Sequence, residues 1–273
     1  MIYRTVTLAP YEGATLTAIC VSNTPELKQP PRRAVVVCPG GGYNMLSDRE
    51  AEPIATQFLA AGFATFILRY TVGDGAANFA PLCQVALAIR HVREHAAEYN
   101  VDPDYVFTCG FSAGGHLAAS AGILTDHPAV QKLMADAPAD IARPTGMILA
   151  YPVITAGEKA HHGSIHKLCG TKTPTKEEED RFSLELHVSD KTPPAFIWHT
   201  FSDEAVPVEN SLYLAQVMSE HHIPVEMHIF PYGHHGLALG DERTMSGRDT
   251  LIHPYVSCWV PLAVRWVNEF GKW

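Results

Sequence analysis

Gly110-Phe111-Ser112-Ala113-Gly114 separates an apolar run at residues 105–109 from a stretch of small residues that begins at position 115. The apolar run predicts a buried strand, and the small residues predict a helix. In such a sharp strand-to-helix turn the serine takes strained backbone angles, and a glycine on each side lets the neighbouring backbone pass without a Cβ clash. The motif therefore predicts an α/β fold that presents Ser112 at the edge of a sheet. The plainer alternative is a glycine-rich turn with an incidental serine.

Apolar runs and helical patterns alternate on both sides of this turn. Two alternating segments near the N-terminus, residues 3–8 and 15–21, predict antiparallel strands. The later runs are continuous and β-branched, as in strands that are buried on both faces of a parallel sheet. They cover residues 34–38, 64–70, 105–109, 147–153, 195–200 and 225–230.

Helical patterns fill the segments between these strands. The clearest helix follows Asn78, because apolar residues recur at helical spacing as far as Ala96 and charged residues occupy the other side. Shorter patterns span residues 50–61, 115–124, 209–222 and 259–270. We therefore expect a mostly parallel, doubly wound central sheet flanked by helices. With 273 residues and 47% hydrophobic residues, the chain suits one domain over residues 1–273.

Residues 155–190 depart from this pattern, because they are polar and contain only brief apolar clusters. We interpret them as a lid-like insertion within the domain, placed over the carboxyl edge of the sheet where α/β active sites form. A solvated excursion without a role is the alternative, since long loops are either functional or disordered.

Charge and composition restrict the partners. The chain has 20 Lys+Arg against 29 Asp+Glu, a net charge of −9, and no basic patch, so nucleic acid is not an expected partner. No signal-peptide pattern and no apolar stretch near ~20 residues appear, so we expect a soluble cytoplasmic protein without a membrane partner. The 6 cysteines are scattered singly, which predicts reduced thiols.

Candidate partners for Ser112 follow the later strands. Asp203 comes directly after the predicted strand at 195–200, where a carboxylate can orient an imidazole and stabilise its protonated form. The adjacent Glu204 is a rival for this role. His235 follows the last strand and is the expected general base, but His234 could replace it because the sequence does not show which ring faces the serine.

Cys38-Pro39-Gly40-Gly41-Gly42-Tyr43 follows the predicted strand at 34–38. Its glycines expose backbone N–H groups, and those of Gly41 or Gly42, together with the N–H of Ala113, could stabilise an oxyanion formed by attack of the serine. An ordinary turn is the alternative for this segment.

Two further histidines have metal-ligand spacing. His162 and His166 stand at i and i+4, but the sequence shows no nearby carboxylate that completes a site, so a solvated loop without metal is the expectation. The chemistry of a serine, a histidine and an aspartate needs no cofactor.

The sequence resembles the acetylxylan-esterase-like branch of the α/β-hydrolase superfamily, which is related to hormone-sensitive-lipase-like esterases. Pro39 stands where the latter usually have a histidine before the glycines. The resemblance spans nearly the whole chain. It is carried by Pro39-Gly40-Gly41-Gly42-Tyr43, Gly110-Phe111-Ser112-Ala113-Gly114-Gly115-His116, Thr192-Pro193-Pro194, Trp198-His199-Thr200-Phe201-Ser202-Asp203, Val206-Pro207-Val208-Glu209-Asn210-Ser211 and His235-Gly236.

The resemblance implies a serine carboxylic-ester hydrolase that acts through an acyl-enzyme on a small-molecule ester, in particular an acetylated sugar or xylo-oligosaccharide. A general short-chain carboxylesterase or an arylformamidase-like hydrolase is the alternative. Peptidase activity is a minor alternative, because the related peptidases carry a propeller domain that this chain is too short to hold. A non-enzymatic α/β-hydrolase scaffold would be expected to lack some of the catalytic residue types, and all of them are present here. The sequence is compatible with a homo-oligomer.

Overall fold

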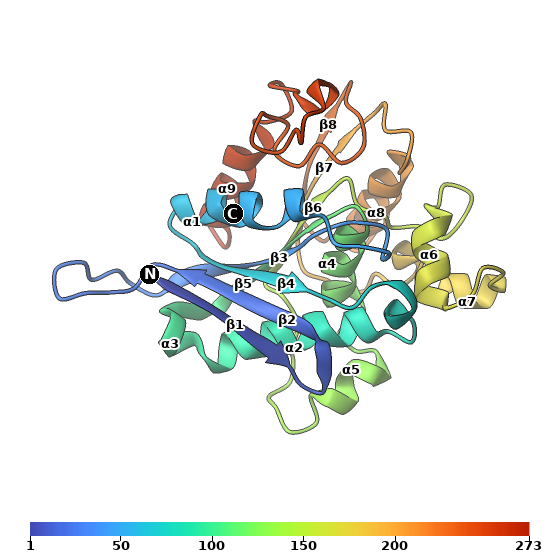
Figure 1. Ribbon diagram of the computed structural model, residues 1–273. Helices are drawn as coiled ribbons and strands as arrows, with labels where there is room; N and C mark the ends of the chain where they lie inside the picture. The colour runs from blue at the N-terminus through green and yellow to red at the C-terminus, as the bar shows by residue number, and fades with distance from the viewer. Residues whose placement is uncertain (273) are drawn as a thin grey trace.

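The computed structural model describes residues 1–272, which form one eight-stranded sheet covered by helices on both faces (Figure 1). The sheet order is β1-β2-β4-β3-β5-β6-β7-β8. The strands are β1 (Ile2–Leu8), β2 (Tyr11–Cys20), β3 (Arg32–Cys38), β4 (Ala64–Arg69), β5 (Val101–Phe111), β6 (Gly146–Ala150), β7 (Ala195–Thr200) and β8 (Val225–Phe230).

The register explains the alternating pattern of the first two strands. β1 pairs antiparallel with β2, and β2 pairs antiparallel with β4. All other pairs, from β4 through β3 to β8, are parallel. The central strands are buried on both faces, so β6 is wholly apolar, β3 is apolar after its first two residues and β7 is apolar as far as Trp198. The predicted strands are therefore present, although β6 ends at Ala150, before the expected residue 153.

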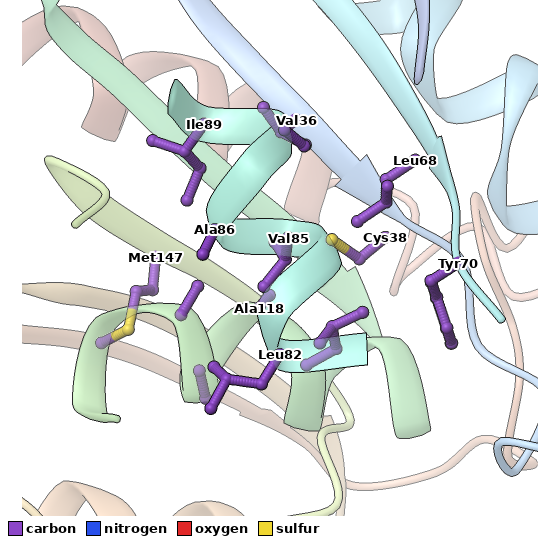
Figure 2. Close-up of a cluster of buried hydrophobic side chains, with 14 of the residues drawn as sticks. Val36, Cys38, Leu68, Tyr70, Leu82, Val85, Ala86, Ile89, Ala118 and Met147 are labelled. Carbon is purple, nitrogen blue, oxygen red and sulfur yellow. The ribbon is translucent and has the colours of Figure 1, made fainter. Parts of the chain in front are cut away.

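Helices cover the sheet on both faces (Figure 1). Side chains of α1 and α9 belong to one buried cluster, and side chains of α2, α4 and α8 belong to the other. Figure 2 shows Val85 and Ile89 of α2 in this second cluster together with Val36 of β3 and Ala118 of α4. The helices are α1 (Glu52–Ala60), α2 (Ala80–Glu94), α3 (Ala96–Tyr99), α4 (Ala113–Ile123), α5 (Pro128–Leu133), α6 (His162–Cys169), α7 (Lys176–Asp180), α8 (Glu209–Glu220) and α9 (Trp259–Glu269), with short 3-10 turns η1 (Asp48–Glu50), η2 (Gly73–Ala76), η3 (Leu184–Leu186) and η4 (Asp249–Leu251).

The segment predicted as an insertion lies between β6 and β7 and contains α6, α7 and η3. Its brief apolar clusters are anchors, because Ile165 and Leu184 are fully buried and Phe182 is 5% exposed. The Leu184 amide also donates to the Ile154 carbonyl at 3.0 Å. The insertion is thus packed into the core beside α4, and it stands at the right of Figure 1, where α6 and α7 are labelled.

Within residues 1–272, none of the helices has the length and apolar character needed to cross a bilayer. The six cysteines are free thiols, and four of them are buried.

Candidate active site

Ser112 links β5 directly to α4, and its backbone is strained at φ 53° and ψ −119°. Backbone hydrogen bonds hold Ser112 in this conformation. Its amide donates to the Ala150 carbonyl at 3.0 Å, and its carbonyl accepts from the Val153 amide at 3.1 Å. A Cβ at Gly110 would lie 2.0 Å from the Gly114 carbonyl oxygen, and one at Gly114 would lie 2.1 Å from the Cys38 carbonyl oxygen. Only glycine fits at these two positions, which is the physical basis of the sequence motif.

A continuous chain of hydrogen bonds runs from this serine. His235 Nε2 lies 2.8 Å from Ser112 Oγ, and His235 Nδ1 lies 2.7 Å from Asp203 Oδ2. The structure therefore brings together the three residues that we selected from the sequence. In this geometry the Asp203 carboxylate accepts the Nδ1 proton, which leaves Nε2 as the acceptor for the serine hydroxyl.

The two rival residues lie elsewhere. His234 is exposed and faces the ring of His253, with ring centroids 6.5 Å apart. Glu204 is exposed, whereas the Asp203 carboxylate is fully buried. The neighbouring residues in sequence thus point to solvent while His235 and Asp203 point to the serine.

Hydrogen bonds join the Asp203 loop to the His235 loop. Ser202 Oγ accepts from the Gly233 amide at 3.0 Å, and Thr200 Oγ1 donates to the Gly233 carbonyl at 2.9 Å. A Cβ at Gly233 would lie 2.8 Å from Thr200 Cγ2, so the close approach needs a glycine. These contacts consequently fix the position of Asp203 relative to His235.

The Asp203 carboxylate is held in its ionised form. Burial raises the pKa of Asp203, but hydrogen bonds from His199 and His235 outweigh burial and hold that pKa well below its usual range. The other carboxylate oxygen accepts from the amides of Ala205 and Val206 at 3.0 and 2.9 Å. The aspartate can therefore stabilise an imidazolium on His235 while remaining an anion.

His199 lies behind Asp203 and was not among the predicted site residues. Its Nε2 is 2.9 Å from the Val206 carbonyl and 3.4 Å from Asp203 Oδ2, so the Nε2 proton lies between these two acceptors. His199 Nδ1 accepts from the Ser211 hydroxyl at 2.7 Å. In the sequence, His199 stands in the segment 198–203 that carries the resemblance, four residues before the aspartate, but nothing there gives it a role.

The glycine loop after β3 approaches the serine closely. A Cβ at Gly40 would lie 3.1 Å from Ser112 Cβ, and one at Gly41 would lie 2.2 Å from the Met45 carbonyl oxygen. Gly41 and Gly42 have φ of 129° and 66°. Within residues 1–272, the amides of Gly41, Gly42 and Ala113 donate no hydrogen bond to another protein group. These N–H groups remain available to an anionic oxygen beside Ser112.

The loop is anchored through a buried histidine. The Tyr43 hydroxyl lies 2.9 Å from His116 Nδ1, and His116 Nε2 lies 2.9 Å from the Phe182 carbonyl. Burial lowers the pKa of His116 to about 4, so the ring is neutral, donates from Nε2 to the carbonyl and accepts from the tyrosine. His116 thereby connects the glycine loop, the helix of the serine and the insertion.

A buried carboxylate holds the same loop from its other side. Glu50 is 3% exposed, and its Oε2 accepts from the Gly40 amide at 2.9 Å. Its Oε1 accepts from the Tyr151 hydroxyl at 2.7 Å, and that hydroxyl accepts from the Ala238 amide at 2.9 Å. The Tyr151 ring packs edge-on against His235, with centroids 5.1 Å apart. No pattern in the sequence distinguishes Glu50 from its exposed neighbours.

Ser112 and His235 open into a cavity of about 700 Å³, and α6 with its N-cap forms part of the wall. A second cavity of about 530 Å³ shares Gly163 and Lys167 with the first. The insertion therefore lines the pocket of the serine. The first cavity is lined by Gly41, Gly42, Asn44, Met45, Ser47, Arg49, Glu50, Ser112, His161, Gly163, Lys167, His235, Gly236 and Arg248.

His161 is the insertion side chain that comes nearest to Gly42 of the glycine loop. A Cβ at Gly42 would lie 3.7 Å from His161 Cε1. The Ser164 amide donates to His161 Nδ1 at 3.2 Å, so a neutral ring carries its proton on Nε2. Burial, followed by the neighbouring imidazoles of His235 and His162, lowers the pKa of His161 and favours that neutral form.

The expectation that no carboxylate lies near His162 and His166 is wrong. The structure places Glu179 of α7 beside His162 and His166, with one ligand atom of each residue within 4.8 Å of the others. The two helices pack together across a turn, so a carboxylate 13 residues beyond His166 becomes a neighbour. No local sequence pattern contains this relationship.

The sheet order and the strained serine between β5 and α4 define the α/β-hydrolase fold. A family model described as BD-FAE matches residues 23–218. The chain belongs to the BD-FAE family.

Two curated relatives extend this similarity. An endo-1,4-beta-xylanase B from Butyrivibrio fibrisolvens is 40% identical over 220 residues, which are 79% of this chain and 34% of that protein. An acetylxylan esterase from Xylanibacter ruminicola is 32% identical over 219 residues, which are 78% of this chain and 42% of that protein. The chain thus aligns with less than half the length of either relative. The predicted acetylxylan-esterase-like resemblance is confirmed.

Two solved structures show the same architecture over the whole chain. An acetyl ester-xyloside bifunctional hydrolase from Caldicellulosiruptor lactoaceticus has a TM-score of 0.83 and 32% identity, and covers 98% of this chain and 96% of that one. A carboxylesterase from Lactobacillus plantarum has a TM-score of 0.84 and 31% identity, and covers 99% of this chain and 97% of that one. The predicted α/β-hydrolase fold is confirmed.

Proposed function

We propose that this protein is a serine carboxylic-ester hydrolase that removes acetyl groups from sugars or short xylo-oligosaccharides. Ser112 is the nucleophile, His235 the general base and Asp203 the residue that orients the histidine. The observation that carries the proposal is the hydrogen-bond chain from Asp203 through His235 to Ser112, at 2.7 and 2.8 Å, beside a cavity of about 700 Å³.

In the first half-reaction, Ser112 Oγ attacks the ester carbonyl while His235 Nε2 takes the hydroxyl proton. The carbonyl oxygen becomes an oxyanion, and the resulting imidazolium is stabilised by the buried Asp203 carboxylate. Collapse of the tetrahedral intermediate breaks the bond to the alcohol oxygen, which leaves with the proton from His235. The product is an acyl-enzyme on Ser112.

The oxyanion is stabilised by amides that have no other acceptor within residues 1–272, those of Ala113 and of Gly41 or Gly42. Such preorganised donors are typically worth ~3–4 kcal/mol each in the transition state. Water then attacks the acyl carbon with His235 again as the base, and Ser112 is released with a carboxylic acid as the second product.

The side chains that line the cavity can form hydrogen bonds with the alcohol part of an ester that is rich in hydroxyl groups, such as a sugar. Apart from Met45, its side chains are polar or absent, and Lys167, Arg248 and His161 offer hydrogen-bond donors to a sugar. A long acyl chain would need an extended apolar channel, because each buried methylene gains ~0.8 kcal/mol only where apolar surface receives it. The xylan-related names of two relatives agree with this substrate class.

The decisive experiment compares kcat/KM in one series on acetylated xylo-oligosaccharides, other acetylated sugars, p-nitrophenyl esters of increasing acyl length and an aryl formamide. We expect an acetylated sugar to give the highest value. Faster turnover of long acyl esters or of the formamide would overturn the substrate assignment and favour a general carboxylesterase or an arylformamidase-like enzyme.

Ser112→Ala is the matched control for this series, because it removes the nucleophile and keeps every other group in the cavity. Any product that Ser112→Ala releases at the parent rate comes from a contaminant or from uncatalysed hydrolysis. Activity that Ser112→Ala abolishes on every substrate is catalysed at this site.

A further inference from the structure

The insertion carries two histidines one helical turn apart on α6. His162 is exposed and His166 is half-buried, and their ring centroids lie 5.9 Å apart. Residues at i and i+4 share one face of a helix, so two imidazoles at this spacing can bind one metal ion.

Glu179 of α7 supplies a third donor at the same place. One ligand atom from each of His162, His166 and Glu179 lies within 4.8 Å of the other two. A capping box at the start of α7 sets its orientation, since the Glu178 carboxylate accepts from the Thr175 amide at 2.8 Å. Glu178 is thus occupied by the cap, and the next carboxylate along the helix lies beside α6.

The three side chains are available to a ligand. Within residues 1–272, neither imidazole nor the Glu179 carboxylate makes a hydrogen bond or an ion pair with another protein group. Their acidic neighbours on α7 are paired: Glu177 lies 3.6 Å from the Arg181 guanidinium, and Asp180 accepts from Lys176. The unpaired carboxylate of the helix is therefore the one that stands beside the two histidines.

We propose that His162, His166 and Glu179 bind a divalent transition metal ion of the zinc class, which cross-links α6 to α7. Two imidazoles select Zn²⁺ and related ions over Ca²⁺ and Mg²⁺, which prefer oxygen ligands. Three protein ligands with water as the fourth make a tetrahedral site. Metal bonds of ~2.0–2.1 Å bring ligand atoms to about 3.3 Å from one another, which rotation of these unpaired side chains can supply.

The cross-link would stabilise one wall of the serine's cavity. The N-cap and the first two turns of α6 supply His161, Gly163 and Lys167 to that wall, whereas the two metal-binding histidines do not line it. The metal site is thus structural and separate from the groups at Ser112. It does not depend on the proposed ester hydrolysis.

The test is a titration of chelator-treated protein with Zn²⁺ by calorimetry, in a Cys258→Ser background because Cys258 is the exposed thiol among residues 1–272. We expect one site with a Kd below ~100 µM. His162→Ala, His166→Ala and Glu179→Gln should each weaken it by roughly tenfold or more. Zn²⁺ should also raise the Tm of the parent, and raise it much less in Glu179→Gln.

His228→Ala is the matched control, because His228 and Glu226 form a two-residue imidazole–carboxylate pair at 2.9 Å on β8, away from the insertion. This variant should retain the parent Zn²⁺ affinity. Co²⁺ gives a second readout, since tetrahedral coordination produces intense visible absorption that the His162→Ala variant should lose. A Kd above ~100 µM, or an affinity that the three insertion variants leave unchanged, would overturn the proposal.

Discussion

The Tyr151 hydroxyl donates to Glu50 Oε1 at 2.7 Å, and this buried hydrogen bond connects the two loops that flank Ser112. On one side, Glu50 Oε2 accepts from the Gly40 amide in the glycine loop. On the other side, the tyrosine hydroxyl accepts from the Ala238 amide, three residues past His235. Glu50, which is not one of the three predicted catalytic residues, thus fixes the loop of the oxyanion donors relative to the loop of the general base.

Glu50→Gln keeps the size of the side chain but replaces one acceptor oxygen by an NH₂ group. That group would face either the Gly40 amide or the Tyr151 hydroxyl, which are both donors. We expect kcat to fall by about 10–100-fold with little change in KM, because a shift in preorganised donors acts on the transition state. A double-mutant cycle with Tyr151→Phe should show a coupling free energy of about 0.5–3 kcal/mol.

Glu52→Gln is the control for this position, since Glu52 is a surface carboxylate 3.4 Å from Arg69. Its kcat should match the parent value. Equal losses in the two variants would show that Glu50 has no positioning role.

Gly41→Ala tests the glycine loop directly. The added Cβ would lie 2.2 Å from the Met45 carbonyl oxygen, so the loop must move and its free amides with it. We expect kcat to fall by about 10²–10³-fold, the usual cost of losing an oxyanion donor. Gly62→Ala has a similarly positive φ of 96° but no atom within 4 Å, so it should lower stability slightly and leave kcat intact. Unchanged turnover in Gly41→Ala would exclude this loop from oxyanion stabilisation.

His161→Ala removes the insertion side chain that comes nearest to Gly42. If the Nε2–H of His161 contacts the alcohol part of the substrate, KM for an acetylated xylo-oligosaccharide should rise about fivefold to tenfold, equivalent to one hydrogen bond of ~1 kcal/mol. KM for p-nitrophenyl acetate, which has no sugar, should change little. Equal shifts in KM for both substrates would indicate a general loss of pocket shape.

Stability should depend on His116 in mild acid. Burial lowers its pKa to about 4 in the folded protein, while a histidine in the unfolded chain titrates near ~6.5. Between these pH values the unfolded chain binds a proton that the folded protein excludes, so the free energy of unfolding falls as pH decreases. The loss from this residue is on the order of 3 kcal/mol and is complete near pH ~4.

Urea unfolding at several pH values measures this effect. His116→Gln should lower stability at neutral pH but flatten the dependence between pH ~4 and ~6.5, whereas the exposed His222→Gln should leave the slope unchanged. Asp203, whose pKa is held below its usual range, contributes stability that is lost only at lower pH, as its carboxylate becomes protonated. An identical slope in His116→Gln and in the parent would contradict the account of His116.

The fold and the three residues Ser112, Asp203 and His235 could be predicted because both produce recognisable local patterns in the sequence. The parallel strands are continuous apolar runs, and the serine turn needs Gly110 and Gly114 at fixed positions. The order of Ser112, Asp203 and His235 along the chain follows the strand ends. The strand runs and the serine turn can each be recognised within a window of about ten residues, and the order of the three residues needs only the positions of the strand ends.

The remaining site residues depend on tertiary contacts. Glu50 meets Tyr151 across 101 residues, and Glu179 meets His166 through the packing of two short helices. His199 was part of a segment that carries the resemblance, but the sequence did not show that it contacts Asp203. In each case the side chain acquires its role from what packs against it, which neither composition nor spacing expresses. The burial of the insertion has the same origin, because the brief apolar clusters that contain Ile165 and Leu184 do not show what they pack against.

The central claim is that Ser112 is a nucleophile activated by His235. The most direct measurement is intact-mass analysis of the folded protein after treatment with a fluorophosphonate, followed by peptide mapping, on the parent, Ser112→Ala and His235→Asn. The account predicts one adduct per chain on Ser112, none in Ser112→Ala, and labelling of His235→Asn at least about 100-fold slower. Folded parent protein that stays unlabelled, or that carries its adduct on another residue, would contradict it.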